Sequence, residues 1–431
     1  MSHAQIQMLR TRARAIFDRA VAAADPARAL AQGLSAHPLP QPGPGGRTLL
    51  VAIGKAAPAM MHEALQHVRG PHQALVITHY ENQMTVTGAQ ILRAAHPVPD
   101  ENGLLAGKAV IELLAQARPQ DQVVALISGG GSALVPAPVP GIGISDKAEF
   151  NALLLASGLD IVRMNLIRQQ LSQLKGGGIL RHAAPAPVTS YILSDVIGDD
   201  LRAVASGPTV APIGSHADAR RACIEADIWH QLPDTVRRFL DQSLPPADPP
   251  RPGVNVLVGS NRHSLRAALA EAADGFDARI VSDAMIGDVE DAARDIVRAC
   301  CATPPDAPRA LLFGGETTVR LQGDGLGGRN QELALRVARL LSRSRSGADW
   351  VFLSGGTDGR DGPTEAAGGL VDPQSLDRIR GAGLRVETLL ARNDSHTALQ
   401  AAGDLLVTGA TGTNVADIQC LLFVPQGMQI A

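Results

Sequence analysis

Short apolar runs alternate along the chain with longer stretches in which apolar residues recur at helical spacing. Apolar runs of five or six residues are typical of buried strands, whereas recurrence every three or four residues indicates an amphipathic helix. In the first half, the pattern predicts helices near 5–24 and 103–117 and two more within 146–174, with strands at 48–53, 74–78, 91–95, 123–127 and 189–193. This alternation predicts βαβ units and a mostly parallel sheet.

A proline-dense segment, 245–253 (PPADPPRPG), interrupts this pattern and predicts a stiff linker. After it, strands are predicted near 254–258, 279–282, 310–313, 350–353 and 419–423. The chain is therefore predicted to form two Rossmann-like, three-layer α/β domains, over 1–244 and 253–431. Ligands of such sheets bind at the carboxyl ends of the strands.

Composition narrows the class of protein. The chain has 431 residues, of which 45% are apolar but only 3% aromatic, so its cores have to be built from Ala, Val, Leu and Ile. A net charge of −3 gives no electrostatic case for nucleic acid or an anionic membrane. The four cysteines form no C-x-x-C pair, and no run approaches the ~18 apolar residues that cross a membrane. We expect a cytoplasmic protein, and the sequence leaves its oligomeric state open.

Four predicted strands end in glycine followed by small, polar or charged residues, at 51–55, 126–132, 312–317 and 352–359. Glycine lets backbone N–H groups turn toward a ligand, and a strand, a glycine-rich turn and a helix start together favour phosphorylated ligands. Lys55 follows the first of these strands, among Gly54, Ala56 and Ala57. It is either an exposed lysine or a functional cation with space cleared around it.

Carboxylates also gather after predicted strands. Asp195, Asp199 and Asp200 follow 189–193, and Asp358 and Asp361 follow 350–353. Each group is either a set of turn-forming residues or a magnesium locus, since magnesium prefers carboxylates together with phosphate oxygens.

A G-x-G-x-x-G match at 323–328 lies between a possible strand at 317–322 and a helix from about 330. A dinucleotide turn needs an acidic residue at the end of the next strand, and Asp349 precedes that strand instead. We therefore discount this match. The sequence contains neither a Walker A motif nor G-x-S-x-G, which excludes a P-loop kinase and argues against a nucleophile-elbow hydrolase.

Taken together, the motifs resemble those of the glycerate 2-kinase family with a MOFRL-type C-terminal domain, some of whose members carry the label hydroxypyruvate reductase. The resemblance covers nearly the whole chain. Its motifs lie at 53–57 (IGKAA), 96–100 (HPVPD), 126–136, 163–178, 194–209, 259–261 (GSN), 314–317 (GGET), 328–332 (GRNQE), 354–372, 393–395 (NDS) and 411–414 (TGTN).

The resemblance implies a two-domain α/β enzyme with its active site in the interdomain cleft. Such an enzyme transfers the γ-phosphoryl group of ATP to D-glycerate with a divalent metal, Mg²⁺, and typically gives 2-phosphoglycerate. The catalytic lysine of the family corresponds to Lys55 and its arginine to Arg329. Fixed cations suit phosphoryl transfer, which depends on positioning and charge stabilisation.

Further roles are expected for residues near these two cations. Asp358 is expected as a base toward the glycerate hydroxyl, Asp195 as a metal ligand and Glu316 as a carboxylate on the metal or nucleotide side. The remaining candidates are expected to contact phosphate or substrate: Ser128, Gly129, Gly130, Gly131, Ser132, Lys175 and Asn261.

Two alternatives stay open. An NAD(P)H-dependent hydroxypyruvate reductase would need 323–328 to be a true dinucleotide turn. A non-catalytic regulator that binds a sugar acid or a nucleotide would need no catalytic cations.

Overall fold

The computed structural model describes residues 3–242, 251–302, 306–344, 348–425 and 428. The chain forms two compact units, each built on one six-stranded sheet. The parallel-sheet unit comprises Pro26–Ser194 and Asp199–Val258, and the mixed-sheet unit comprises Met1–Asp25, Asp195–Gly198 and Gly259–Ala431. Within the described ranges, no helix has the length and apolar character needed to cross a membrane.

The first sheet has the strand order β3-β2-β1-β4-β5-β6, and the neighbouring strands from β1 to β5 are parallel. Ile53 at the end of β1 lies opposite Ile77 and Ile127, so the carboxyl ends of the central strands coincide. The strands are β1 (Thr48–Ile53), β2 (His72–His79), β3 (Gln90–Ala94), β4 (Gln122–Ser128), β5 (Val188–Leu193) and β6 (Val254–Gly259). Every residue of β1 and β4 is buried, as expected for central parallel strands.

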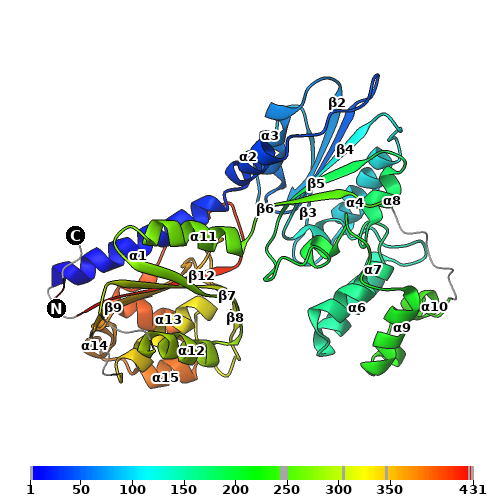
Figure 1. Ribbon diagram of the computed structural model, residues 1–431. Helices are drawn as coiled ribbons and strands as arrows, with labels where there is room; N and C mark the ends of the chain where they lie inside the picture. The colour runs from blue at the N-terminus through cyan, green and yellow to red at the C-terminus, as the bar shows by residue number, and fades with distance from the viewer. Residues whose placement is uncertain (1–2, 243–250, 303–305, 345–347, 426–427, 429–431) are drawn as a thin grey trace. The chain divides into compact units, whose positions relative to one another are not determined.

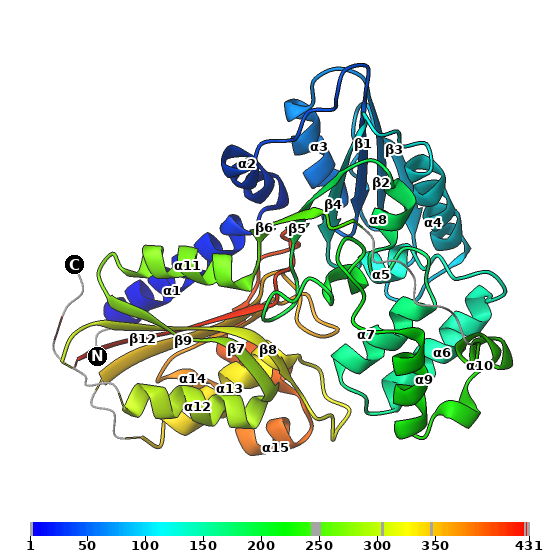
Figure 2. The same ribbon diagram turned by 45° about the vertical axis from the view of Figure 1, so that its right-hand side comes forward.

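Helices cover both sides of this sheet, and Figure 2 shows α3 and α4 on opposite sides of it. Four more helices, α6, α7, α9 and α10, pack into a separate apolar cluster around Phe150, Leu154, Ile167 and Val236 (Figure 2). The helices of this unit are α2 (Pro26–Ala36), α3 (Ala57–His67), α4 (Glu101–Leu114), α5 (Gly131–Leu134), α6 (Ile144–Ala156), α7 (Ile161–Gln170), α8 (Gly178–Ala183), α9 (His216–Glu225) and α10 (Asp234–Leu240), with 3₁₀ turns η1 (Val204–Ser206) and η2 (Trp229–Gln231).

The second sheet has the order β11-β10-β9-β12-β8-β7. Its central strand β12 is antiparallel to both neighbours, so β8 and β9 run the same way, and Asp417 at the start of β12 lies opposite Gly315 and Gly356. The carboxyl ends of β8 and β9 therefore meet beside Asp417. The strands are β7 (Asp277–Asp288), β8 (Arg309–Thr318), β9 (Ala348–Gly356), β10 (Gly368–Val371), β11 (Leu405–Leu406) and β12 (Asp417–Pro425).

Helices also flank the second sheet on both faces. Figure 1 shows α1 and α11 on one side and α12, α13 and α15 on the other. Alternate strand residues serve the two layers: Leu311 and Phe313 pack toward α12 and α13, whereas Ala310 and Leu312 pack toward α1 and α11. The helices are α1 (His3–Ala23), α11 (Asn261–Ala272), α12 (Val289–Cys301), α13 (Arg329–Leu341), α14 (Ser375–Gly381), α15 (Val386–Ala391) and α16 (Ser395–Ala402).

The predicted fold class, two three-layer α/β domains, is confirmed. The mostly parallel sheet predicted from the first half is confirmed, whereas the second sheet is mixed: β7 and β8 are parallel, and the other neighbouring strands that the structure describes are antiparallel. The predicted strand at 254–258 does exist, but it joins the edge of the first sheet and not the second.

The compact units also divide the chain differently from the predicted ranges 1–244 and 253–431. Residues 3–25 pack with the second sheet because Leu9, Ile16 and Phe17 of α1 bury against β9 and β12. Residues 195–198 belong to the same unit. Of the predicted linker 245–253, residues 245–250 lie outside the described residues, and 251–253 lead directly into β6.

Candidate active site

Lys55 lies in a turn at the carboxyl end of β1. Hydrogen bonds join this turn to the turn after β4. The N–H of Lys55 donates to the Gly129 carbonyl oxygen at 2.9 Å, and the N–H of Ala56 donates to Ser128 Oγ at 3.1 Å. Gly54 has a φ of +132°, and a Cβ there would lie 2.1 Å from Ser128 Oγ, so this position requires glycine. Ser128 and Gly129 thus fix the backbone that carries the lysine.

Gly130 and His96 lie directly beside Lys55. A Cβ on Gly130, whose φ is +83°, would lie 3.1 Å from Lys55 Cγ and 3.2 Å from His96 Cδ2. Burial, and then the charge of Lys55, lower the pKa of His96 to about 4. His96 is therefore neutral at pH 7, and Lys55 supplies the positive charge at this point.

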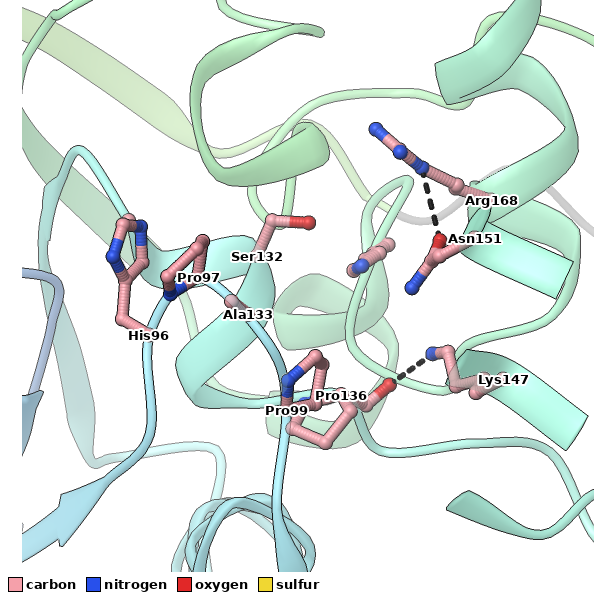
Figure 3. Close-up of a pocket in the computed structure, with 11 residues that line it drawn as sticks. His96, Pro97, Pro99, Ser132, Ala133, Pro136, Lys147, Asn151 and Arg168 are labelled. Carbon is pink, nitrogen blue, oxygen red and sulfur yellow. Dashed lines mark hydrogen bonds between the residues drawn. The ribbon is translucent and has the colours of Figure 1, made fainter. Parts of the chain in front are cut away.

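The turn after β4 borders a cavity of about 190 Å³ (Figure 3). Three predicted residues, Gly130, Ser132 and Lys175, line it. Ser132 Oγ also contacts Ser206 Oγ at 3.1 Å. Gly131 is not among the residues that line this cavity. A Cβ there would lie 3.0 Å from the Ala205 methyl group, so this glycine allows close packing.

In the mixed-sheet unit, Arg329 opens α13 and its guanidinium is held by two carboxylates. Its Nε and Nη2 donate to Asp417 at 2.6 and 2.9 Å, and Nη1 lies 2.9 Å from Glu316 Oε1. Burial alone would lower the pKa of Arg329, but the bonds to Asp417 and the charge of Glu316 raise it above its ordinary value. Burial raises the pKa of Asp417, and the Arg329 charge opposes that shift. Arg329 is thus a permanently charged group in a fixed position.

The two predicted carboxylates after β9 have different surroundings. Asp361 is 3% exposed and accepts the N–H groups of Asn330 and Gln331 at 3.1 and 2.8 Å, so it caps the start of α13. Asp358 is partly exposed, and its Oδ1 accepts the Arg360 N–H at 3.0 Å. Asp361 is therefore committed to the helix, while Asp358 keeps a second oxygen for other partners.

Asn261, predicted to contact phosphate or substrate, begins α11 and is bonded to the chain before β12. Its Nδ2 donates to the carbonyl oxygens of Val415 and Asp417 at 2.8 and 2.9 Å. A Cβ on Gly314 would lie 2.1 Å from Asn261 Oδ1, so glycine is required there too. The structure gives Asn261 a role in positioning Asp417, and its predicted ligand contact stays a prediction.

The acidic segment after β5 does not gather its carboxylates. Asp200 pairs with Arg202 at 2.8 Å, Asp199 adopts a left-handed φ of +55°, and Asp195 belongs to the mixed-sheet unit. In the part of the chain that the structure describes, no three His, Cys, Asp or Glu side chains are grouped as metal ligands. The role of Asp195 as a metal ligand stays a prediction.

Comparisons with known proteins identify the family. Residues 12–241 match the model of a domain of unknown function, DUF4147, and residues 309–417 match the MOFRL family. A protein of Pyrococcus horikoshii named "Glycerate 2-kinase" is 37% identical over 386 residues, which are 86% of each chain. The chain belongs to the glycerate kinase family.

Two further relatives of this chain carry different names, one that of a glycerate kinase and the other that of a hydroxypyruvate reductase. The crystal structure of a glycerate kinase from Thermotoga maritima superposes with a TM-score of 0.87 at 35% identity, covering 97% of this chain and all of that one. A protein of Agrobacterium vitis named "Putative hydroxypyruvate reductase" is 41% identical and covers 95% of this chain and 93% of its own.

The G-x-G-x-x-G segment at 323–328 is the place where a hydroxypyruvate reductase would need a dinucleotide-binding turn. β8 ends at Thr318, so the possible strand at 317–322 stops after its first two residues, and 319–328 form a loop leading to α13. The loop packs on the chain after α15: the Gly325 N–H donates to the Arg392 carbonyl oxygen at 2.9 Å, and Gln322 N–H donates to Asn393 Oδ1 at 2.7 Å. These glycines permit close packing of two loops and do not form a tight strand-to-helix turn.

Sequence reasoning missed three charged residues of these sites. Asp417 starts an apolar strand, and an acid in that place was the available signal. Lys147 and Arg168 line the same cavity as Lys175, although they lie on α6 and α7. The signal for Lys147 was the rarity of lysine in this chain, and Arg168 lies within the 163–178 motif without being singled out there.

Proposed function

We propose that the protein transfers the γ-phosphoryl group of ATP to D-glycerate and releases 2-phosphoglycerate and ADP. The names of the Pyrococcus horikoshii and Thermotoga maritima relatives support the reaction class. The structural observation that supports it most directly is the fixed Lys55 turn, which adjoins a cavity lined by further cations.

Phosphoryl transfer needs positive charges that are positioned before the phosphates arrive, because reorganising them during the reaction would raise the barrier. Lys55 meets this requirement through the backbone bonds of its turn, and Arg329 meets it through Asp417. We propose that both cations stabilise the charge of the transferring group. Asp358 would accept the proton of the glycerate hydroxyl, since its carboxylate is partly exposed and not committed to an ion pair within the described chain.

The nucleotide is proposed to bring its own magnesium ion. Magnesium in such enzymes is commonly held by one or two carboxylates together with substrate phosphates, so a protein-only cluster of three ligands is not required. Asp195 and Glu316 are the carboxylates we propose for it, which leaves Asp358 to act as the base, whereas Asp361 is committed to the α13 cap. Bound there, the ion would neutralise charge on the phosphate oxygens.

The activity is tested by coupled measurement of ADP release. We expect release that depends on both D-glycerate and Mg²⁺ and that stops with excess EDTA. Phosphorus NMR of the product should show phosphate on the 2-hydroxyl. Oxidation of NADH by hydroxypyruvate without glycerate-dependent ADP release would refute the kinase and support the reductase.

A further inference from the structure

Lysine is rare in this chain, and its few positions are unevenly placed. The sequence contains 4 lysines beside 35 arginines. Lys108 is an exposed helix residue that faces Glu112 at 3.7 Å. Lys55 lies against Gly130, and Lys147 and Lys175 are 2% and 5% exposed in the cavity that Gly130 borders. Three of the four lysines thus gather at one end of the parallel sheet.

The cavity brings together side chains from separate elements. Lys147 comes from α6, Arg168 from α7, and Lys175 from the chain before α8. Figure 3 shows Arg168 donating to Asn151, at a distance of 3.2 Å, and Lys147 donating to the Pro136 carbonyl oxygen. The opposite wall carries Ser132 and His96. Within the described ranges, no ion pair joins any of the three cations to a carboxylate.

Buried cations without countercharges are costly. Burial and the nearby Arg168 lower the pKa of Lys147 to about 7, and burial with Lys147 and Arg168 lowers the pKa of Lys175 well below its ordinary value. A methionine in either place would avoid this cost, because it fills similar space without a charge. The arrangement is unfavourable for the empty protein and becomes favourable when an anion enters.

We propose that the cavity bounded by Lys147, Arg168 and Lys175 is a binding subsite for a phosphate group. A phosphate monoester carries about −1.5 to −2 charges and three acceptor oxygens, which match three cations better than the single charge of a carboxylate does. The Ser132 hydroxyl and the Asn151 amide supply further donors around the same space. Which phosphate binds, that of phosphoglycerate or that of the nucleotide, rests on the proposed function. The phosphate subsite itself does not.

The test uses the full chain with inorganic phosphate as the first probe. Phosphate should raise the Tm of the wild-type protein, since a ligand that binds only the folded state stabilises it. Calorimetric titration should show at least about tenfold weaker phosphate binding for Lys147→Met and Lys175→Met, because each loses a charged hydrogen bond. Lys108→Met is the matched control and should bind phosphate like the wild type.

Stability gives an independent readout. If the two buried lysines serve a ligand and not the fold, their methionine variants should melt at or above the wild-type Tm without phosphate. Should both variants fail to fold, Arg168→Gln tests the same subsite from a half-buried position and should also weaken phosphate binding. Unchanged phosphate affinity in every variant that folds would overturn the proposal.

Three organic probes then identify the source of the phosphate: 2-phosphoglycerate, ADP and D-glycerate. Selective loss of 2-phosphoglycerate affinity, or of ADP affinity, in the lysine variants supports the subsite and shows which of these ligands supplies the phosphate. Loss of D-glycerate affinity alone, with phosphate binding intact, would make it a carboxylate site and overturn the proposal. Phosphate binding that depends on these lysines, in a protein without glycerate-dependent ADP release, would refute the kinase and leave the subsite standing.

Discussion

Arg329 and the lysines of the cavity are both partly or fully buried cations, but their surroundings are opposite. Arg329 is 34% exposed and bonds to Asp417, whose side chain is fully buried, and to Glu316, which is 48% exposed. Lys147 and Lys175 are more deeply buried, yet the described chain offers them no carboxylate. The charge of Arg329 is thus neutralised by Asp417 and Glu316, whereas Lys147 and Lys175 have no such countercharge within the described chain.

This difference separates two ways of using positive charge. A cation that is paired within the chain keeps its position and protonation state whether or not a ligand is present. An unpaired buried lysine shifts its pKa readily, so its charge depends on pH and on what binds beside it. Arg329 is therefore suited to act as a fixed charge, and Lys147 and Lys175 are suited to respond to an anion.

The largest effect is expected from removing the two fixed cations. Lys55→Ala and Arg329→Ala should each lower kcat by about 10²-fold or more, the scale found when one preorganised charge or donor is lost. Steady-state ADP assays measure this. Lys108→Ala and Arg380→Ala, which remove exposed cations of surface pairs, are the controls. Near wild-type kcat in either site variant, with an unchanged melting curve, would show that this residue is not catalytic.

Asp417 should matter next, because it holds Arg329 and does not have to touch substrate. Asp417→Asn keeps the shape but removes the charge, and we expect kcat to fall about tenfold as the guanidinium loses its orientation. Stability should drop by about 2–3 kcal/mol, below the usual loss for a fully buried pair because Arg329 is partly exposed. Asp377→Asn breaks the exposed pair with Arg380 and should change neither quantity. An Asp417→Asn enzyme with wild-type kcat would contradict the positioning role.

Most strands were predictable because continuous apolar runs mark them in any context. Their partners were not predictable from the same runs. Strand β6 follows a proline-rich segment that suggests a boundary, yet it completes the first sheet. The direction of β12 depends on pairing with β8 and β9, which no local pattern encodes.

The site shows the same limit. Lys55 and Gly130 stood out because they lie in glycine-rich turns after predicted strands, whereas Arg329 was indicated only by the resemblance to the glycerate 2-kinase family. Lys147 and Arg168 lie on different helices of the four-helix cluster, and only tertiary packing brings them to the Gly130 turn. A local motif can reveal a residue that a turn positions, but not one that a separate helix contributes.

The unpaired lysines predict a distinctive dependence of stability on pH. Lys147 has a pKa of about 7 in the folded protein and an ordinary lysine value, 10.5, when unfolded. Between these values the unfolded chain binds more protons, so the contribution of Lys147 to stability rises with pH, by at most ~1.4 kcal/mol per pH unit. His96, Arg168 and Lys175 share the cavity and remain in the Lys147→Met variant, where loss of the Lys147 charge leaves the Lys175 pKa less strongly lowered.

Urea unfolding at pH 7.5, 8.5 and 9.5 should therefore show a smaller increase of unfolding free energy in Lys147→Met than in the wild type. Arg168→Gln should also reduce the increase, since it removes a charge that lowers the Lys147 pKa. Parallel pH curves for the wild type and Lys147→Met would mean that this lysine is charged in the folded protein at all three pH values.

The smallest effect is expected at the outer partner of Arg329. Glu316 is about half exposed, and exposed ion pairs contribute roughly 0–1 kcal/mol because water screens them and two side chains lose freedom. Glu316→Gln should therefore lower stability by less than about 1 kcal/mol, and the Asp417 bonds should keep Arg329 in place. If Glu316 serves only this pair, kcat should fall less than threefold and the Mg²⁺ concentration for half-maximal rate should not change. If it also contacts the metal or nucleotide, as its position at the end of β8 led us to expect, that Mg²⁺ or ATP requirement should rise while the Tm stays the same. Titrating Mg²⁺ and ATP separately with this one variant thus distinguishes a carboxylate that supports the arginine from one that binds the ligand.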